Sequence, residues 1–399
     1  MIVRTLLSFW AVTLLAASFP AAPAGTAFYS PPALGTGVHG DLIWSRALDG
    51  GAVLPSAARN ELVLYRTTAV DGSDVAVSGM VAIPKGTAPR GGWPVVTWAH
   101  GTTGDGLQCA PSRYPANGSM YQYLKVADNV LDDFVAHGYA VVQTDYEGQG
   151  TPGVHPYLVG EAEGRDTIDI VRAARQLDPN IGTRYVVLGH SQGGHSAIFA
   201  ASLGQAWAPE LTLLGVVALA PASQLGPWIK SLPKQSDSEL GFGFAGLLIR
   251  AYASVYPDVR TEQLFVPAAA PFEEQLGRLC AGELFAQDSW GGLIPAKVFA
   301  PGADLAPLLR RIAQNDPGAA RIAVPALLVQ GSADDIVPAV ATEVLDSQLC
   351  DSKTLLTFDE VEGANHINVI WRARTTVRDW VDDRFAGKPA ASNCAALNR

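Results

Sequence analysis

Short runs of apolar residues recur along the chain and alternate with longer stretches of helical period. The apolar runs lie at 94–99, 140–145, 185–188, 214–219 and 326–330. Continuous apolar runs of this length are typical of strands in a parallel sheet that helices cover on both faces. Helical patterns occupy 121–136 and 161–177, and an amphipathic helix is predicted over 369–385. The alternation predicts βαβ units, and therefore an α/β fold with a mainly parallel central sheet flanked by helices.

Two segments depart from this alternation. The β-rich runs 61–70 and 74–84 lie on either side of Asp71-Gly72, which predicts a hairpin. The segment 221–320 separates two of the predicted sheet strands and mixes aromatic-rich helical stretches with Pro and Gly breaks. An excursion of this length is predicted to be a helical cap inserted into a core that is built from 25–220 and 321–399.

The first residues have the pattern of a secretory signal peptide. Arg4 supplies a positive charge, an apolar stretch covers 6–19, and Ala22 and Ala24 are small residues suited to a cleavage site. The apolar stretch is shorter than the roughly 20 residues that a membrane span needs. We therefore expect a signal peptide over 1–24, cleaved between about Ala24 and Ala27, and a protein exported to the periplasm or outside the cell without stable membrane insertion.

The composition narrows the class of protein. The chain has 399 residues, of which 48% are apolar, and this excludes an intrinsically disordered protein. Lys and Arg number 28 against 38 Asp and Glu, so the formal net charge is −10. A negative surface repels phosphate backbones, and nucleic acid is therefore not expected as a partner.

Four cysteines in an exported chain are expected to form disulfides. Four thiols allow three pairings. Cys350 and Cys394 bracket the last segment, whereas Cys109 and Cys280 lie far apart in the sequence, and we favour the pairs Cys109–Cys280 and Cys350–Cys394. No two cysteines have Cys-x-x-Cys spacing and no histidine lies near them at zinc spacing, so no metal site is predicted.

The strongest chemical signal is Gly189-His-Ser191-Gln-Gly193, which lies between the strand 185–188 and a helix-compatible run over 194–203. A Gly-x-Ser-x-Gly sequence between a strand and a helix forms a sharp elbow that exposes the serine hydroxyl at the carboxyl edge of the sheet. An ordinary turn is the alternative interpretation. The context favours Ser191 as a nucleophile.

A serine nucleophile needs a histidine base held by a carboxylate, and on this elbow the chain order is Ser, acid, His. Only His195 and His366 follow Ser191. His195 lies on the helix that leaves the elbow, so its ring projects away from the hydroxyl. His366, in a Gly-containing loop after the strand-like run 355–361, is the predicted base, and an ordinary surface histidine is the alternative.

The predicted acid is Asp334. It directly follows the buried strand 326–330, where a βα turn brings it to the same sheet edge as Ser191. Its neighbour Asp335 is the alternative, and we prefer Asp334 because two apolar residues then anchor the turn behind it. The acid holds the tautomer of the histidine and stabilises its imidazolium.

The tetrahedral intermediate of such a reaction needs backbone N–H donors. One is expected from Gln192, the residue after the nucleophile, and the other from the loop His100-Gly-Thr-Thr-Gly104, which follows the strand 94–99. Thr102 is the predicted donor of this loop, with Thr103 as the alternative. His100 is predicted to pack beneath the loop as a structural residue.

With these motifs the chain resembles the secretory lipase family of α/β-hydrolases, which includes the fungal lipase A type and bacterial exported lipases and esterases. The shared features extend over nearly the whole mature chain: Phe28-Tyr-Ser-Pro-Pro, Cys109-Ala-Pro-Ser, Asp145-Tyr-Glu-Gly-Gln-Gly, Gly-His-Ser191-Gln-Gly, Gly331-Ser-Ala-Asp with Val337-Pro, and His366. The resemblance implies an α/β-hydrolase fold and a helical cap over the site, and it supports the two disulfide pairs. The His100–Gly104 loop is closer to that of other bacterial lipases than to that of the fungal members. The resemblance therefore does not decide between Thr102 and Thr103 as the oxyanion donor of this loop.

The predicted function is that of a secreted serine carboxylic-ester hydrolase that cleaves triacylglycerols or shorter acyl esters through an acyl-enzyme on Ser191. The expected partner is a small acyl ester or lipid, met through transient contact with a lipid interface, and no cofactor is required. The alternatives are a secreted acyltransferase or peptidase with the same triad, and a non-catalytic binding protein. Five apolar residues of the cap either line an acyl tunnel or form plain core: Trp228, Phe242, Phe244, Leu247 and Leu248.

Overall fold

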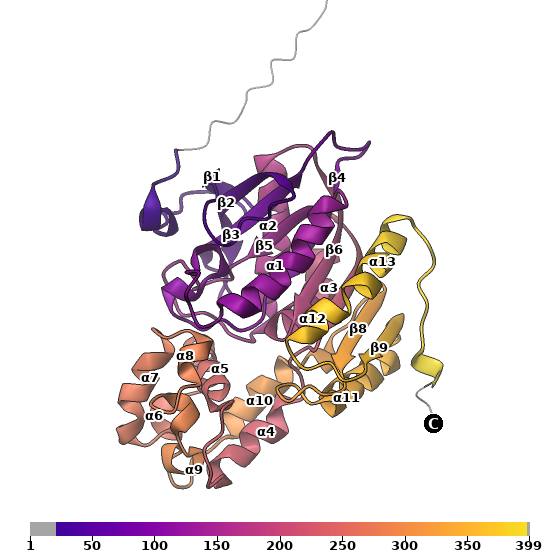
Figure 1. Ribbon diagram of the computed structural model, residues 1–399. Helices are drawn as coiled ribbons and strands as arrows, with labels where there is room; N and C mark the ends of the chain where they lie inside the picture. The colour runs from indigo at the N-terminus through magenta and orange to yellow at the C-terminus, as the bar shows by residue number, and fades with distance from the viewer. Residues whose placement is uncertain (1–20, 397–399) are drawn as a thin grey trace, which may run out of the picture.

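The computed structural model describes residues 21–396, so the predicted signal peptide over 1–24 falls almost wholly outside the described residues. Within this range one sheet has the strand order β1-β2-β3-β5-β4-β6-β7-β8-β9 (Figure 1). The first three strands and the β3–β5 pair are antiparallel, and the other neighbouring strands are parallel. The strands are β1 Leu42–Ala47, β2 Ala57–Thr68, β3 Asp74–Pro84, β4 Trp93–Ala99, β5 Ala140–Thr144, β6 Ile181–His190, β7 Thr212–Leu219, β8 Ala326–Gly331 and β9 Leu356–Val361. The predicted mainly parallel sheet is confirmed.

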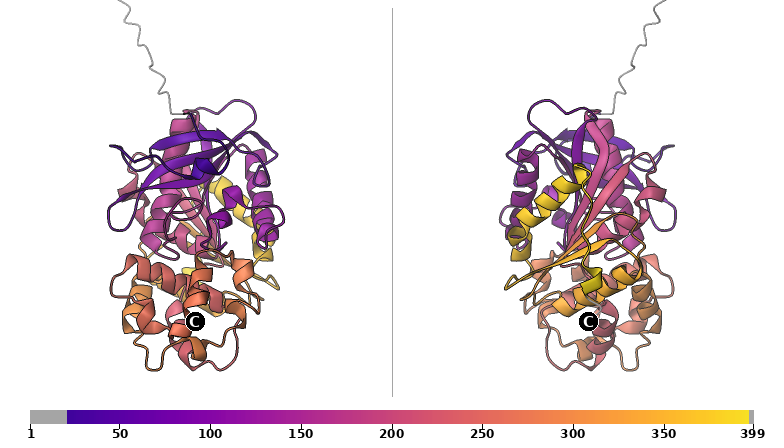
Figure 2. Two further views of the ribbon diagram at one scale, coloured as in Figure 1. Left: turned by 90° about the vertical axis from the view of Figure 1, so that its left-hand side faces the viewer. Right: turned by 90° about the vertical axis from the view of Figure 1, so that its right-hand side faces the viewer.

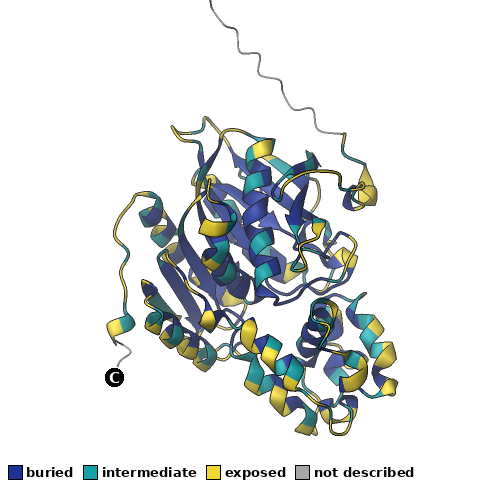
Figure 3. Ribbon diagram, turned by 180° about the vertical axis from the view of Figure 1, so that it is seen from behind, coloured by how far each residue is buried: buried dark blue, intermediate teal, exposed yellow. Residues whose placement is uncertain are grey.

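Helices cover both faces of this sheet because its central strands are apolar on both sides, as the buried strands in Figure 3 illustrate. In β4, Val95 belongs to the core formed with α2, α3 and α11, whereas the next residue, Val96, belongs to the core formed with α1, α12 and α13. This alternation is the ordinary two-residue period of a strand. The helices are α1 Tyr121–Ala136, α2 Gly160–Leu177, α3 Gln192–Trp207, α11 Ala339–Asp351, α12 Asn368–Arg372 and α13 Arg374–Phe385.

The structure agrees with some of the helices and strands predicted from the sequence and departs from others. The helix expected over 121–136 coincides with α1. The single helix expected over 369–385 is wrong in one respect, because α12 and α13 meet at Ala373, whose φ of −84° and ψ of −5° interrupt the helical geometry. The edge strand β1 was not anticipated, since polar Ser45 and Arg46 interrupt its apolar pattern.

Between β7 and β8 the chain leaves the sheet and forms a helical insertion, which lies beyond the carboxyl ends of the strands (Figures 1 and 2). Phe242, Leu247 and Leu248 are buried in a core that the insertion forms with residues 157–159 and Ala162, which favours plain packing over an acyl tunnel for these three residues. At the two stems of the insertion, the backbone N–H of Gln224 donates to Asp316 Oδ2 at 2.8 Å. The helices of the insertion are α4 Leu225–Ser231, α5 Phe242–Val255, α6 Thr261–Leu264, α7 Ala270–Leu276, α8 Ala281–Leu284, α9 Pro295–Val298 and α10 Ala306–Gln314.

Two disulfides join segments that are separate in the sequence. Cys109, in the loop after β4, is bonded to Cys280 at the start of α8. Cys350, near the end of α11, is bonded to Cys394 in the C-terminal segment. The first bridge therefore ties the insertion to the sheet, and the second fastens the end of the chain against α11.

Candidate active site

Ser191 lies in a strained turn between β6 and α3. Its φ of 59° and ψ of −119° lie outside the regions that a residue with a side chain normally adopts. The flanking glycines are required by packing: a Cβ atom on Gly189 would lie 1.9 Å from the carbonyl oxygen of Gly193, and one on Gly193 would lie 1.8 Å from that of Ala99. This close packing of strand, turn and helix holds Ser191 at the carboxyl edge of the sheet, at the N-terminus of α3.

The imidazole of His366 lies between Ser191 and Asp334. Its Nε2 is 2.9 Å from Ser191 Oγ, and its Nδ1 is 2.8 Å from Asp334 Oδ2. Asp334 Oδ1 accepts the backbone N–H of Ile336 and that of Val337, each at 2.9 Å. Burial acts to raise the pKa of Asp334, but His366 and the two N–H groups outweigh it and lower the pKa below its ordinary value. The arrangement can move a proton from the serine hydroxyl to the imidazole, while an ionised carboxylate stabilises the imidazolium.

His190, which sequence reasoning passed over, holds the backbone of His366. Its Nε2 is 2.7 Å from the carbonyl oxygen of His366, so this nitrogen donates, and its Nδ1 is 3.1 Å from the hydroxyl of Tyr123. The same hydroxyl accepts the backbone N–H of Gly101 at 2.8 Å. Burial lowers the pKa of His190, and a neutral ring fits these contacts, with one donor and one acceptor nitrogen. The only sequence signal for this role is its position between Gly189 and Ser191 in the elbow.

The other two histidines considered from the sequence lie away from the serine hydroxyl. His195 is buried on α3, and its Nε2 is 2.8 Å from the carbonyl oxygen of Asn315. His100 is buried beneath its loop, where Nδ1 is 2.8 Å from the carbonyl oxygen of Gly101, and burial lowers its pKa to about 4. His100 therefore packs as a neutral structural residue.

Three backbone N–H groups near the elbow are free to bind a ligand. The amides of Thr102, Thr103 and Gln192 have no acceptor among residues 21–396, although all three residues are buried. Buried backbone N–H groups are nearly always paired, so unpaired ones beside a nucleophile are suited to an oxyanion. The Thr102 hydroxyl is 2.8 Å from that of Tyr157, which fixes the side chain of Thr102 and leaves its amide available.

A family model for secretory lipases matches residues 120–393 of the chain. The chain belongs to the secretory lipase family. It is accordingly a secreted carboxylic-ester hydrolase, as its lipase relatives indicate. Lipase 5 of Candida albicans is 25% identical to it, over 96% of this chain and 85% of the relative. A Mycobacterium tuberculosis protein described as a probable inactive lipase is 24% identical, over 93% of this chain and 84% of the relative.

The fold of this lipase is shared with solved structures. Candida antarctica lipase A superimposes with a TM-score of 0.77, over 92% of this chain and 87% of that chain, at 20% sequence identity. At this identity the likeness concerns the fold alone, which is that of an α/β-hydrolase. No helix in the described part of the lipase is long and apolar enough to cross a membrane. Within the same residues, no cluster of three or more His, Cys, Asp or Glu has the arrangement of a metal site.

In this lipase the loop that carries Thr102 and Thr103 is fastened to the insertion. The backbone N–H of Ala281 donates to the carbonyl oxygen of Thr103 at 2.8 Å, and Gly104 pairs with Cys280 as an antiparallel bridge. The disulfide from Cys280 to Cys109 closes the same loop. The insertion therefore helps to set the conformation of the candidate oxyanion loop.

Asp105, at the centre of this loop, is a buried carboxyl group. Neither of its oxygens has a hydrogen-bond partner among the described residues, and its nearest charge is Arg250 Nε, 3.6 Å away on α5. Burial raises its pKa to about 8, and Arg250 offsets only part of this effect. Burial also raises the pKa of Glu147 to about 7 and that of Asp128 to about 6. Folded lipase therefore retains protons that the unfolded chain releases near pH 4.

We expect the free energy of unfolding to fall as the pH rises from about 6 to 9, because these protons are lost from the folded protein through its raised pKa values. The contribution is complete below the unfolded pKa of 3.8 for Asp105, and it disappears as the pH passes about 8. Asp105→Asn should flatten the upper part of this profile. Urea unfolding followed by tryptophan fluorescence at pH 5, 7 and 9 measures it, with the exposed Asp335→Asn as control. A stability that rises from pH 6 to 9 would contradict the prediction.

Proposed function

We propose that the lipase hydrolyses acyl esters through a triad of Ser191, His366 and Asp334. The observation that carries this proposal is the hydrogen-bonded series from Ser191 Oγ to His366 Nε2, at 2.9 Å, and from His366 Nδ1 to Asp334 Oδ2, at 2.8 Å. The strained backbone of Ser191 supports it, because strain at a buried elbow persists where the surrounding structure enforces it.

In the proposed reaction, Ser191 Oγ attacks the ester carbonyl while His366 Nε2 takes the hydroxyl proton. The tetrahedral oxyanion accepts hydrogen bonds from the amides of Gln192 and of Thr102 or Thr103. Collapse expels the alcohol, which receives the proton from His366, and leaves an acyl-enzyme. Water then attacks the acyl-enzyme with His366 again as base, and the carboxylic acid leaves.

We further propose that the segment 221–320 acts as a cap over the site and that the substrates are lipid esters. The cap is supported by the position of the helical insertion beyond the carboxyl ends of the strands, the edge where Ser191 lies. Support for lipid esters comes from two exposed isoleucines beside the proposed acid and base. Ile336, two residues after Asp334, is 41% exposed, and Ile367, directly after His366, is 44% exposed. Apolar side chains next to a hydrolytic site favour contact with an acyl chain or a lipid interface.

A chain-length series tests the substrate class. We expect p-nitrophenyl esters to be cleaved from acetyl through palmitoyl, and emulsified triglyceride to be cleaved as well, with Ser191→Ala protein as the blank. A steep fall beyond butyrate would contradict a lipid substrate and indicate a short-chain esterase. Product analysis with added alcohol, and a parallel assay on N-acyl peptides, would reveal a transferase or a peptidase. If no ester is turned over, the proposed hydrolysis is overturned in favour of a non-catalytic binding protein.

A further inference from the structure

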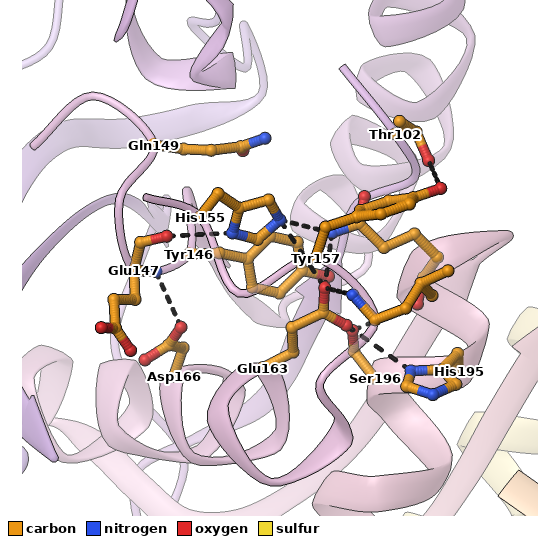
Figure 4. Close-up of polar contacts among 12 residues, drawn as sticks. Thr102, Tyr146, Glu147, Gln149, His155, Tyr157, Glu163, Asp166, His195 and Ser196 are labelled. Carbon is orange, nitrogen blue, oxygen red and sulfur yellow. Dashed lines mark hydrogen bonds and ion pairs between the residues drawn. The ribbon is translucent and has the colours of Figure 1, made fainter. Parts of the chain in front are cut away.

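Glu163, on α2, is a fully buried carboxylate. Figure 4 shows it facing Ser196 and His195. Its Oε1 accepts the backbone N–H of Leu158 at 2.9 Å and the side-chain amide of Gln192 at 2.7 Å. Its Oε2 accepts the hydroxyl of Ser196 at 2.5 Å and lies 3.6 Å from His195 Nδ1. Burying a charge is costly unless it is well paired, and this carboxylate is paired on both oxygens.

His155 shares one of these partners. Its Nδ1 is 2.9 Å from the carbonyl oxygen of Glu147, which can only accept, so this nitrogen carries a hydrogen. Burial lowers the pKa of His155, although Glu163 acts in the opposite direction, and its Nε2 is then free to accept. Nε2 lies 2.8 Å from the amide nitrogen of Gln192. Both hydrogens of this amide are therefore used, one on Glu163 and one on His155, and the side chain of Gln192 has a single orientation.

Gln192 is the first residue of α3, and its backbone N–H is one of the proposed oxyanion donors. Three of its helix's first five side chains, those of Gln192, His195 and Ser196, face the one carboxylate of Glu163. The negative charge of Glu163 beside the first turn of α3 also interacts favourably with the positive end of the helix dipole. The contacts thus fix both the side chain of Gln192 and the turn that carries its amide.

We propose that Glu163 is a positioning residue for the oxyanion hole: by holding the side chains of Gln192 and Ser196, it fixes the backbone amide of Gln192 in the direction that a tetrahedral intermediate requires. The inference rests on the proposed function of Ser191. Losing a whole oxyanion donor costs about 10²- to 10³-fold in kcat, so a misdirected donor costs somewhat less.

Glu163→Gln keeps the shape of the side chain but replaces one acceptor oxygen with a donor. We expect kcat for p-nitrophenyl butyrate to fall about 10- to 100-fold, with KM within about twofold of wild type. An alkylboronic acid binds serine hydrolases as a tetrahedral adduct, so its inhibition constant should rise by the same factor as kcat/KM falls. An ether analogue of the substrate, which has no carbonyl oxygen to place between the oxyanion donors, should bind unchanged.

The matched control is Asp169→Asn. Asp169 is another buried carboxylate on α2, but it bonds to Thr67, His39 and Trp207, away from the elbow. We expect this variant to lose stability while kcat and boronate affinity stay near wild type. An equal loss of kcat in Asp169→Asn would overturn the inference in favour of a general structural effect.

Gln192→Ala provides a second variant in case Glu163→Gln does not fold. It keeps the backbone amide and removes the side chain that Glu163 holds, so kcat should again fall, and the double variant should lose little more than either single one. Wild-type kcat and boronate affinity in Gln192→Ala would overturn the inference. Activity that survives in Ser191→Ala would instead overturn the proposed function, whereas an inactive Ser191→Ala beside a fully active Glu163→Gln would overturn only the positioning role.

Discussion

Replacing Ser191 by alanine is expected to lower kcat/KM for p-nitrophenyl esters by about 10⁶-fold. Among the described residues, Ser191 Oγ is the only hydrogen-bond partner of His366 Nε2, and the substitution removes it together with the covalent route. What remains is the catalysis that oxyanion donors and binding supply on their own, about 10³- to 10⁴-fold over water. The fold should be unaffected, because alanine is smaller and Ser191 Oγ makes no other side-chain hydrogen bond within the described residues.

Two measurements check this expectation. A fluorophosphonate should label wild type once, with peptide mass spectrometry locating the label on Ser191, and should not label Ser191→Ala. Ser347→Ala, at an exposed serine on α11, is the control and should retain wild-type turnover. A label on any other serine, or turnover in Ser191→Ala above one part in a hundred, would assign the nucleophile elsewhere.

Replacing Asp334 by asparagine is expected to lower kcat by about 10⁴-fold. Both oxygens of Asp334 face donors: Oδ1 faces the N–H of Ile336 and of Val337, and Oδ2 faces the amide of Gln330 at 3.1 Å together with His366. An asparagine has to turn its own NH₂ group toward one of these sets. The backbone N–H groups cannot accept, so the NH₂ group turns toward His366. The ring then takes the tautomer with hydrogen on Nε2, which cannot accept the serine proton.

Asp335→Asn is the matched control, since it makes the same change one residue away. Asp335 is exposed, and its side chain makes no hydrogen bond to the residues that the structure describes. We expect its kcat to stay within about twofold of wild type, because surface changes away from a site have small effects. Steady-state kinetics on both variants, with melting curves to confirm folding, decide between them. A large loss in Asp335→Asn beside a small one in Asp334→Asn would reverse the assignment of the acid.

Sequence patterns were most informative where the chemistry depends on local order. The strand, turn and helix around Ser191 could be predicted because a parallel βα unit leaves few arrangements for Gly189 and Gly193. The place of Asp334 at this edge, beside His366, could be predicted because a strand that ends in a known direction carries its next residues to a known edge. In both cases the candidate residue and the element that positions it are neighbours in the sequence.

Residues that act through distant contacts could not be found in this way. In the sequence, Glu163 is one of several acidic residues in a helical pattern, and no neighbouring residue indicates its contact with Gln192. Three of the motifs behind the family resemblance also had no assigned role in the sequence. In the structure they meet, because the hydroxyl of Tyr29 is 2.9 Å from that of Ser112, whose backbone N–H donates to Asp145 at 2.9 Å. Such meetings depend on the tertiary fold, which no local pattern contains.

The bridge between Cys109 and Cys280 has a consequence for the order in which the lipase matures. The two thiols are separated by 171 residues, so a chain that emerges N-terminus first presents Cys109 long before its partner exists. The local Cys350–Cys394 bridge needs only 44 residues to close. This bridge can therefore fasten the loop that carries Thr102 only after the chain has been made as far as Cys280, inside the insertion. The candidate oxyanion loop is made early in synthesis, but the disulfide that fastens it is completed by a residue from the second half of the chain.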